Sequence, residues 1–280
     1  MKVYRPSDLQ AFLREKGVHA KKGLSQNFLI DGNIIQKILD TASMTEKDFV
    51  IEIGSGPGAL TQALLSRGAH VTAIEMDSAF AAALNRLQTL DHRLQVICED
   101  ILKFPLVDFL QKHPGKKFKV VANLPYHITT PILVMLLPLH PWIESLTIMV
   151  QKEFGDRLYG KVGTPEYSSL TLFLQFYATI SKSFTVSPNC FYPKPNVHSA
   201  VLHCQLHPPL LDNNVETFFQ LTRTAFGQRR KMLRASLKEL YGSEKIERAL
   251  VKIGHPITQR PEQLTIHEFI LLYEALDLRE

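Results

Sequence analysis

The stretch that decides the fold is FVIEIGSGPGAL, residues 49–60. Its start, Phe49 to Ile53, is a short apolar run that predicts a buried strand. Three glycines at alternate positions follow, and residues 59–67 have helical character. Strand, glycine turn and helix are typical of a doubly wound α/β sheet, which binds its ligand beyond the carboxyl ends of its strands. Taken alone, the turn equally suits a tight connection without a ligand.

Acidic residues end the next two predicted strands. Residues 70–75 form a run that ends in Glu75, and residues 94–97 are followed closely by Asp100. A carboxylate at the tip of the second strand accepts hydrogen bonds from ribose hydroxyls, and Asp100 suits an adenine amino group. The spacing GxGxG, preceded by Glu52, differs from the dinucleotide pattern, and the chain has no P-loop motif. We therefore expect S-adenosylmethionine, a nucleoside cofactor without phosphates, rather than NAD or ATP.

Composition limits the class of protein. The chain has 280 residues, 45% of them hydrophobic, which suits one large or two globular domains. Its net charge of +5 either aids solubility or serves an anionic partner, and the clustering of cations favours nucleic acid. The cysteines Cys98, Cys190 and Cys204 lack metal-ligand spacing and indicate a reducing compartment. Without a signal-like or membrane-spanning apolar run, we expect a cytoplasmic protein that does not engage membranes.

The segment AKKGLSQNFLID, residues 20–31, combines cations, amides and apolar side chains. In one interpretation the amides only satisfy the backbone of a turn. In the other, the segment folds over the ligand site, with Asn27 bound to the cofactor and Lys21 and Lys22 near a phosphate backbone. The spacing favours neither.

The sequence NLPY, residues 123–126, follows a fourth predicted strand at residues 119–122. Methylation of an exocyclic amine requires acceptors for its two protons, so that the nitrogen lone pair turns toward the methyl group. The amide of Asn123 and the carbonyl of Leu124 supply them, Pro125 stiffens the turn, and Tyr126 offers a face for base stacking. Positioning suffices without a strong base. The alternative is an ordinary turn, but its place at a strand tip favours catalysis.

The loop PNCFYPKPNVHSAV, residues 188–201, contains three prolines and is predicted to be extended. Phe191 or Tyr192 would face Tyr126 across a slot for a base, or else plug the space beneath the loop. The three histidines near it, His198, His203 and His207, lack partners of metal-ligand type, so we expect no metal site.

A change of composition at residues 207–214 predicts a boundary between a catalytic domain, residues 1–207, and a helical domain, residues 208–280. Helices are predicted at residues 215–226, 230–240, 243–251 and 266–276. A basic helix start in this domain is either a solvated face or an RNA contact. The cations expected to contact RNA here are Arg223, Arg229, Arg230 and Arg234.

Six motifs occur in order along nearly the whole chain: QNFLID at 26–31, EIGSGPG at 52–58, NLPY at 123–126, MVQKE at 149–153, FYPKPNVHSAV at 191–201 and FGQRRKMLR at 226–234. Their combination resembles the ribosomal RNA adenine N6,N6-dimethyltransferase family, and most closely its small-subunit branch. The resemblance departs at His198, where the family often has an acidic residue. It implies an α/β fold, a Rossmann-like class I methyltransferase sheet of seven strands, with a small all-α C-terminal domain.

The resemblance also implies a function and a site. S-adenosylmethionine would be held at Asn27, Leu29, Gly54, Glu75, Asp100 and Asn123. The target base would lie between Tyr126 and Phe191. The reaction would dimethylate N6 of two adjacent adenines in a hairpin loop near the 3′ end of small-subunit (16S) rRNA, where loop bases are splayed. The partner would be a pre-assembled small ribosomal subunit, bound by a monomer that serves ribosome biogenesis.

Two alternatives remain. One is a large-subunit (23S) rRNA dimethyltransferase of the macrolide-resistance type, which shares QNFL and NLPY-like motifs. The other is a non-enzymatic RNA-binding assembly factor on the same fold. The motif FGQRRKMLR and the long helical tail favour the small-subunit enzyme, and the intact NLPY argues against loss of activity.

Overall fold

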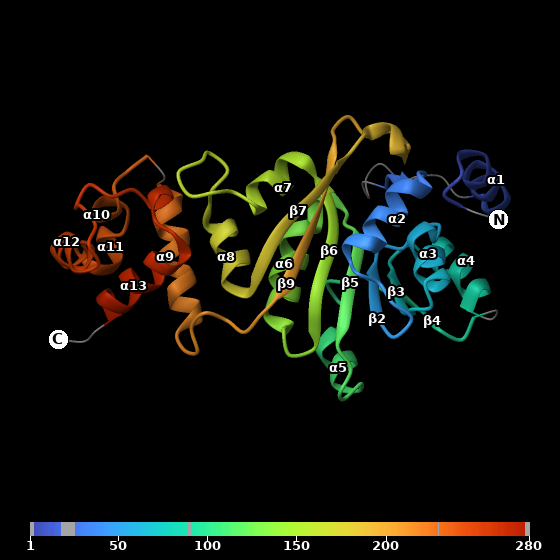
Figure 1. The fold of residues 1–280 in the computed structure, drawn as a ribbon, viewed down its shortest axis with the longest axis horizontal. Helices are drawn as coiled ribbons and strands as arrows, with labels where there is room; N and C mark the ends of the chain where they lie inside the picture. Colours follow the sequence, from blue (N-terminus) through green and yellow to red (C-terminus); the bar gives the residue numbers. More distant parts are fainter. Residues whose placement is uncertain (1–2, 18–25, 89–90, 229, 278–280) are drawn as a thin grey trace. The chain divides into compact units, whose positions relative to one another are not determined.

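The computed structural model describes residues 3–17, 26–88, 91–228 and 230–277 (Figure 1). The chain divides into two compact units, Met1–Gly155 with Thr179–His207 and Asp156–Ala178 with Pro208–Glu280. The segment Asp156–Ala178, which precedes the expected boundary, therefore groups with the C-terminal helices. No helix in the described part of the chain has the length and apolar character needed to cross a membrane.

The first unit alternates strands and helices. Its elements are α1 (Pro6–Lys16), β1 (Phe28–Leu29), α2 (Gly32–Thr41), β2 (Phe49–Ile53), α3 (Ala59–Ser66), β3 (His70–Glu75), α4 (Ser78–Gln88), β4 (Leu94–Cys98), α5 (Leu106–Gln111), β5 (Phe118–Asn123), η2 (Tyr126–Ile128), α6 (Thr129–Leu136), η3 (Leu137–Leu139), β6 (Ile143–Gln151), β7 (Ala178–Val186), η4 (Pro188–Cys190), β8 (Phe191–Tyr192) and β9 (Ser199–Leu206). Helix α7 (Lys152–Leu158) continues from the first unit into the second.

The large sheet has seven strands in the order β4-β3-β2-β5-β6-β9-β7. β2 pairs in parallel with both β3 and β5, β3 with β4, and β5 with β6, whereas β9 runs antiparallel to β6 (Figure 1). In chain order, β3 and β4 are added on one side of β2, and β5 is then added on the opposite side of β2. The adjacent strands β2 and β5 thus mark a topological switch point, and open α/β sheets bind ligands beyond the carboxyl ends of such strands.

The β2 strand forms because its residues, apart from Glu52, are apolar on both faces, as expected for a parallel strand covered by helices. Val50, Ile51 and Ile53 are all buried. The turn after it requires glycine, since Gly54, Gly56 and Gly58 have φ of 71°, 52° and 91°. At Gly58 an added Cβ would also lie 2.6 Å from Leu84 Cδ2, so a larger residue there would require the Leu84 side chain to shift.

A second, two-stranded sheet joins segments far apart in the sequence. β1 pairs antiparallel with β8, with Phe28 opposite Tyr192 and Leu29 opposite Phe191. The N–H of Ile30 extends the pairing by donating to the carbonyl of Cys190 at 2.8 Å. This pairing, which no sequence pattern predicted, fixes residues 26–31 beside the proline loop.

The second unit is helical. Its elements are α8 (Ser169–Tyr177), α9 (Val215–Gly227), α10 (Leu233–Ser236), α11 (Lys238–Tyr241), α12 (Ser243–Lys252), η5 (Pro261–Gln263) and α13 (Ile266–Asp277). Stacked rings of Phe176 and Phe218, with centroids 5.4 Å apart, lie in its core. The predicted single helix over residues 230–240 is wrong, because α10 begins only after Met232. The N–H of Lys231 closes a turn on the carbonyl of Gln228 at 2.8 Å instead.

Candidate functional site

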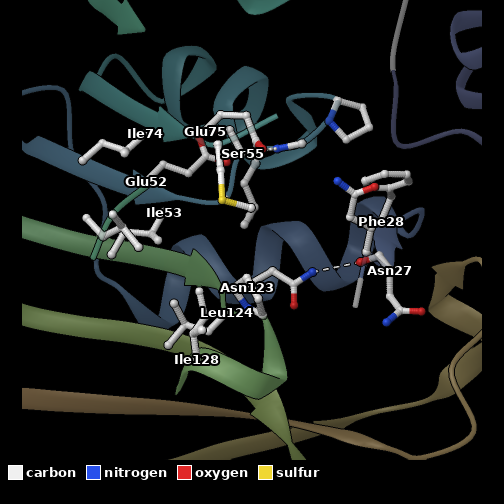
Figure 2. A pocket seen from close by; sticks show the side chains of 18 of the residues that line it. Asn27, Phe28, Glu52, Ile53, Ser55, Ile74, Glu75, Asn123, Leu124 and Ile128 are labelled. Atoms are coloured by element: carbon white, nitrogen blue, oxygen red, sulfur yellow. Dashed lines mark hydrogen bonds between the residues drawn. The ribbon is translucent and has the colours of Figure 1, made fainter. Parts of the chain in front are cut away.

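The first unit contains a pocket at the carboxyl ends of its parallel strands (Figure 2). It encloses about 1030 Å³ of empty space, its mouth to solvent included. The lining residues are 26–29, 52–57, 59–60, 74–76, 99–101 and 123–128. The pocket therefore combines the glycine turn, the tips of β3, β4 and β5, and the β1 segment.

The structure brings most of the predicted site residues to this pocket. Those that line it are Asn27, Leu29, Gly54, Glu75, Asp100, Asn123, Leu124 and Tyr126. Phe191 is not among the lining residues, and only 2% of it is exposed. It stands in register with Leu29, which does line the pocket. Lys21 and Lys22 lie outside the described residues.

Glu75 is fixed by the backbone at the tip of β3. Its Oε2 accepts a hydrogen bond from the N–H of Gly56 at 2.7 Å, and its Oε1 accepts one from the N–H of Asp77 at 2.8 Å. Burial raises the pKa of Glu75, and these two N–H donors act in the opposite direction. Each carboxylate oxygen keeps a lone pair, so Glu75 can accept further hydrogen bonds from a ligand.

Glu52 lies deeper than any of the predicted acidic site residues. Only 1% of it is exposed, and its Oε2 accepts a hydrogen bond of 2.6 Å from the Thr61 hydroxyl on α3. Burial raises the pKa of Glu52 to about 8, and the nearby Glu75 adds to the rise. Glu52 was not among the predicted site residues, although a glutamate inside an otherwise apolar strand that precedes a glycine turn is a usable signal.

Ser55 carries a buried hydroxyl in the middle of the glycine turn. Its Oγ has no hydrogen-bond partner among the described residues, although it lies in the pocket lining. A buried polar atom without a partner costs free energy, which a ligand or a water molecule in the pocket can recover. Together with Glu75 and Asp100, this hydroxyl gives the pocket the hydrogen-bonding groups that a nucleoside cofactor needs.

Asn123 is held in one orientation by the β1 segment. Its Nδ2 donates to the backbone carbonyl of Asn27 at 3.0 Å, as the dashed line in Figure 2 shows. Because this bond uses the amide nitrogen, the amide oxygen remains available as an acceptor in the pocket. The hydroxyl of Tyr126 lies 3.1 Å from Ser199 Oγ, which anchors the far end of its ring. Burial raises the pKa of Tyr126, so the phenol stays neutral.

The predicted RNA-binding cations of the C-terminal region belong to the second unit. Arg223 on α9 and Arg230 in the turn before α10 are exposed. Arg234 forms an ion pair with Glu247, with Nη1 2.8 Å from Oε1. Arg229 lies outside the described residues. Within the described residues there is no group of three or more side chains suited to hold a metal ion.

His203 illustrates why a histidine in this chain need not be a ligand. Its Nδ1 lies 2.9 Å from the Thr147 hydroxyl, across the β6 and β9 pair. Burial lowers the pKa of His203 and so favours the neutral ring.

A mainly parallel seven-stranded sheet with a pocket at its strand tips is the fold of Rossmann-like class I methyltransferases. Two solved structures share this fold over most of the chain. A dimethyladenosine transferase from Plasmodium falciparum superposes with a TM-score of 0.72 at 26% identity, covering 88% of this chain and 95% of that one. The 23S rRNA methyltransferase ErmE superposes with a TM-score of 0.71 at 28% identity, covering 90% of this chain and 100% of that one.

The sequence comparisons are more specific. Residues 17–275 match the model of the ribosomal RNA adenine dimethylase family. A relative from Protochlamydia amoebophila, called ribosomal RNA small subunit methyltransferase A, is 49% identical over 99% of this chain and 98% of its own. One of the same name from Chlamydia muridarum is 44% identical over 96% of both chains. The chain belongs to the ribosomal RNA adenine dimethylase family, which confirms the predicted family and fold.

Proposed function

We propose that this chain transfers methyl groups from S-adenosylmethionine to N6 of two adjacent adenines in a hairpin loop near the 3′ end of small-subunit rRNA. The observation that carries the proposal is the Asn123 amide, whose nitrogen bonds the Asn27 carbonyl at 3.0 Å and leaves its oxygen available in the pocket. Family membership and the names of the relatives support rRNA of the small subunit as substrate. The chain would act as a cytoplasmic monomer on a pre-assembled small subunit, in ribosome biogenesis.

The cofactor site would use the strand tips. Glu75 would accept from the ribose hydroxyls and Asp100 from the adenine amino group, while Gly54 permits close approach of the ligand to the backbone. The remaining contacts would come from Asn27, Leu29 and Asn123. When bound, the cofactor supplies an electrophilic methyl group on a positively charged sulfur. The support for this assignment is that all of these residues line one pocket.

The target amine would be activated by position. Its lone pair is delocalised into the purine ring, so it is a weak nucleophile. The Asn123 amide oxygen and the Leu124 carbonyl would accept its two protons and turn the lone pair toward the methyl group. Preorganised dipoles of this kind need no reorganisation during the reaction. One proton would leave the nitrogen after the new N–C bond has formed and the bond between the methyl group and sulfur has broken, so no strong base would be required.

The target base would stack on Tyr126. The hydrogen bond of 3.1 Å between its hydroxyl and Ser199 would hold the ring in place. Stacking on an aromatic ring is worth about 1–3 kcal/mol per base. Phe191 would form the opposite wall, supported by the pairing of β8 with β1, whose residues line the pocket.

The RNA backbone would be bound by cations. Lys21, Lys22, Arg223, Arg229, Arg230 and Arg234 are the residues we assign to this role. The exposure of Arg223 and Arg230 supports it. Arg234 should contribute less, because its charge is shared with Glu247 at 2.8 Å.

The test is to incubate the protein with small ribosomal subunits and isotopically labelled S-adenosylmethionine, and to map the methyl groups by mass spectrometry of rRNA fragments. Dimethylation of two adjacent adenines near the 3′ end of the small-subunit rRNA supports the proposal. Asn123→Ala should strongly slow it, whereas Asn33→Ala, at an exposed position on α2, should not.

Two other outcomes would overturn the proposal. Modification confined to large-subunit rRNA would favour the second candidate, an enzyme acting like the similar structure ErmE, which is a 23S rRNA methyltransferase. Tight RNA binding without any methyl transfer would favour a non-enzymatic assembly factor.

A further inference from the structure

The pocket is lined by an excess of acidic side chains. Glu52, Glu75, Glu99 and Asp100 all belong to its lining, and none of the described lining residues is a lysine or an arginine. His127 is the one basic side chain among the described lining residues, and residues 18–25 lie outside the described part of the chain. A cleft lined by one sign of charge favours ligands of the opposite sign. The pocket should therefore respond to the charge of its ligand as well as to its shape.

Glu52 is the acid with the least access to water. It lies on β2, between β3 and β5, and it accepts a hydrogen bond of 2.6 Å from the uncharged hydroxyl of Thr61 on α3. The charged group that acts on it is acidic, namely Glu75 at the end of β3, which itself lies beside Asp77. Burying a second negative charge beside the first is unfavourable. Burial accordingly raises the pKa of Glu52 to about 8, so that the free protein carries this carboxyl protonated near neutral pH.

We propose that Glu52 is a specificity-determining residue through which the pocket favours the sulfonium methyl donor over its neutral thioether product. The donor carries one positive charge more than the product. When the donor binds, the Glu52 O–H bond breaks, its proton passes to solvent, and the carboxylate stays in the complex. When the product leaves, Glu52 takes a proton back from solvent. This inference rests on the proposed function, since it assumes S-adenosylmethionine as the ligand.

The pH dependence follows from this balance. Below about pH 8 donor binding must expel a proton, so donor affinity falls as the pH is lowered. For one linked proton the limit is about tenfold for each pH unit. The product brings no added positive charge, so its affinity should change less over the same range. The preference for donor over product should therefore grow as the pH rises toward about 8.

The experiment is isothermal titration calorimetry of the full chain with S-adenosylmethionine and, separately, with S-adenosylhomocysteine, between about pH 6 and about pH 9. Repeating each titration in buffers of different ionisation enthalpy counts the protons released. We expect close to one proton released by the donor near neutral pH, and fewer by the product. Equal proton release and equal pH slopes for the two ligands would overturn the inference.

Variants identify the group responsible. Glu52→Gln should make the donor's pH slope as shallow as the product's. Glu75→Gln should weaken both ligands alike and leave the donor's slope steeper than the product's, but it should move that slope to lower pH, because the charge of Glu75 contributes to the raised pKa of Glu52. Thr61→Val removes the hydrogen bond to Glu52 without altering the pocket lining. Because that hydrogen bond lowers the pKa of Glu52, its loss should raise the pKa and move the pH range over which donor affinity changes to higher pH. A donor slope that survives in Glu52→Gln would reject Glu52 as its source.

The outcomes distinguish a failure of the role proposed for Glu52 from a failure of the proposed function. If Glu52→Gln does not fold, the two ligands' slopes in the unaltered protein still decide the matter. If neither ligand binds at any pH, the proposed function fails. If both bind with the same pH dependence, the function stands and the inference fails.

Discussion

Replacing Glu52 by glutamine tests the electrostatics of the site without any ligand. The substitution keeps the shape of the side chain and can keep the hydrogen bond with Thr61, but it removes the ionisable group. In the unfolded chain the Glu52 carboxyl ionises with a pKa near 4.5, whereas burial raises the pKa to about 8 in the folded protein. Between these two values the folded protein holds a proton that the unfolded chain has lost. Folding is therefore opposed increasingly as the pH rises through this window.

The magnitude follows from the two pKa values. Each pH unit in the window lowers the free energy of unfolding of the unaltered protein by about 1.4 kcal/mol through this one group. Over the interval from 4.5 to about 8 the loss is about 5 kcal/mol. The glutamine side chain of the variant does not ionise, so Glu52→Gln gains stability relative to the unaltered protein as the pH rises. Below pH 4.5 and above about pH 8 the difference should be constant.

The assay is urea unfolding at a series of pH values, followed by tryptophan fluorescence. Trp142 is the single tryptophan of the sequence and lies in the same unit as Glu52, so its emission reports on that unit. Glu144→Gln is the matched control, since Glu144 is an exposed glutamate on β6. Curves of stability against pH that run parallel for the unaltered protein and Glu52→Gln would refute the reasoning.

Three further predictions concern the glycine turn and the NLPY motif. Asn123→Ala should lower kcat/KM in a methyl-transfer assay by about 10²–10³-fold, the usual effect of losing a preorganised polar group; a loss below about tenfold would count against its role. Gly58→Ala should destabilise the fold by about 1–3 kcal/mol in urea unfolding, because φ is 91° and the new Cβ would lie 2.6 Å from Leu84 Cδ2; an unchanged midpoint would contradict this. Tyr126→Leu should lower kcat/KM by about 5- to 150-fold through lost stacking, whereas Tyr126→Phe, which loses only the contact with Ser199, should retain most activity; equal losses would show that the hydroxyl matters more than the ring.

Local pattern was sufficient for the strands that build the sheet. The predicted strands at residues 49–53 and 70–75 coincide with β2 and β3. They are largely apolar runs bounded by turn residues, so burial and hydrogen bonding both favour the same short extended segment. The same reasoning failed at residues 230–240, where helix-forming composition continues through a turn and two short helices. There the Leu233 N–H donates at 2.8 Å to the carbonyl of Gln259, a contact that no local pattern contains.

The amino-acid sequence alone determined the order of strands along the chain, the glycine turn and the family, because these depend on residues close together in the chain and on motifs in a fixed order. Only the tertiary structure decided that the carbonyl of Asn27 accepts a hydrogen bond from the Asn123 amide and that β1 pairs with β8. It also decided that Glu52 is buried beside Glu75. The physical reason is that hydrogen bonds between distant segments and the desolvation of a carboxyl group depend on which surfaces are buried together. Such burial is a property of the folded chain, and neighbouring residues in the sequence do not specify it.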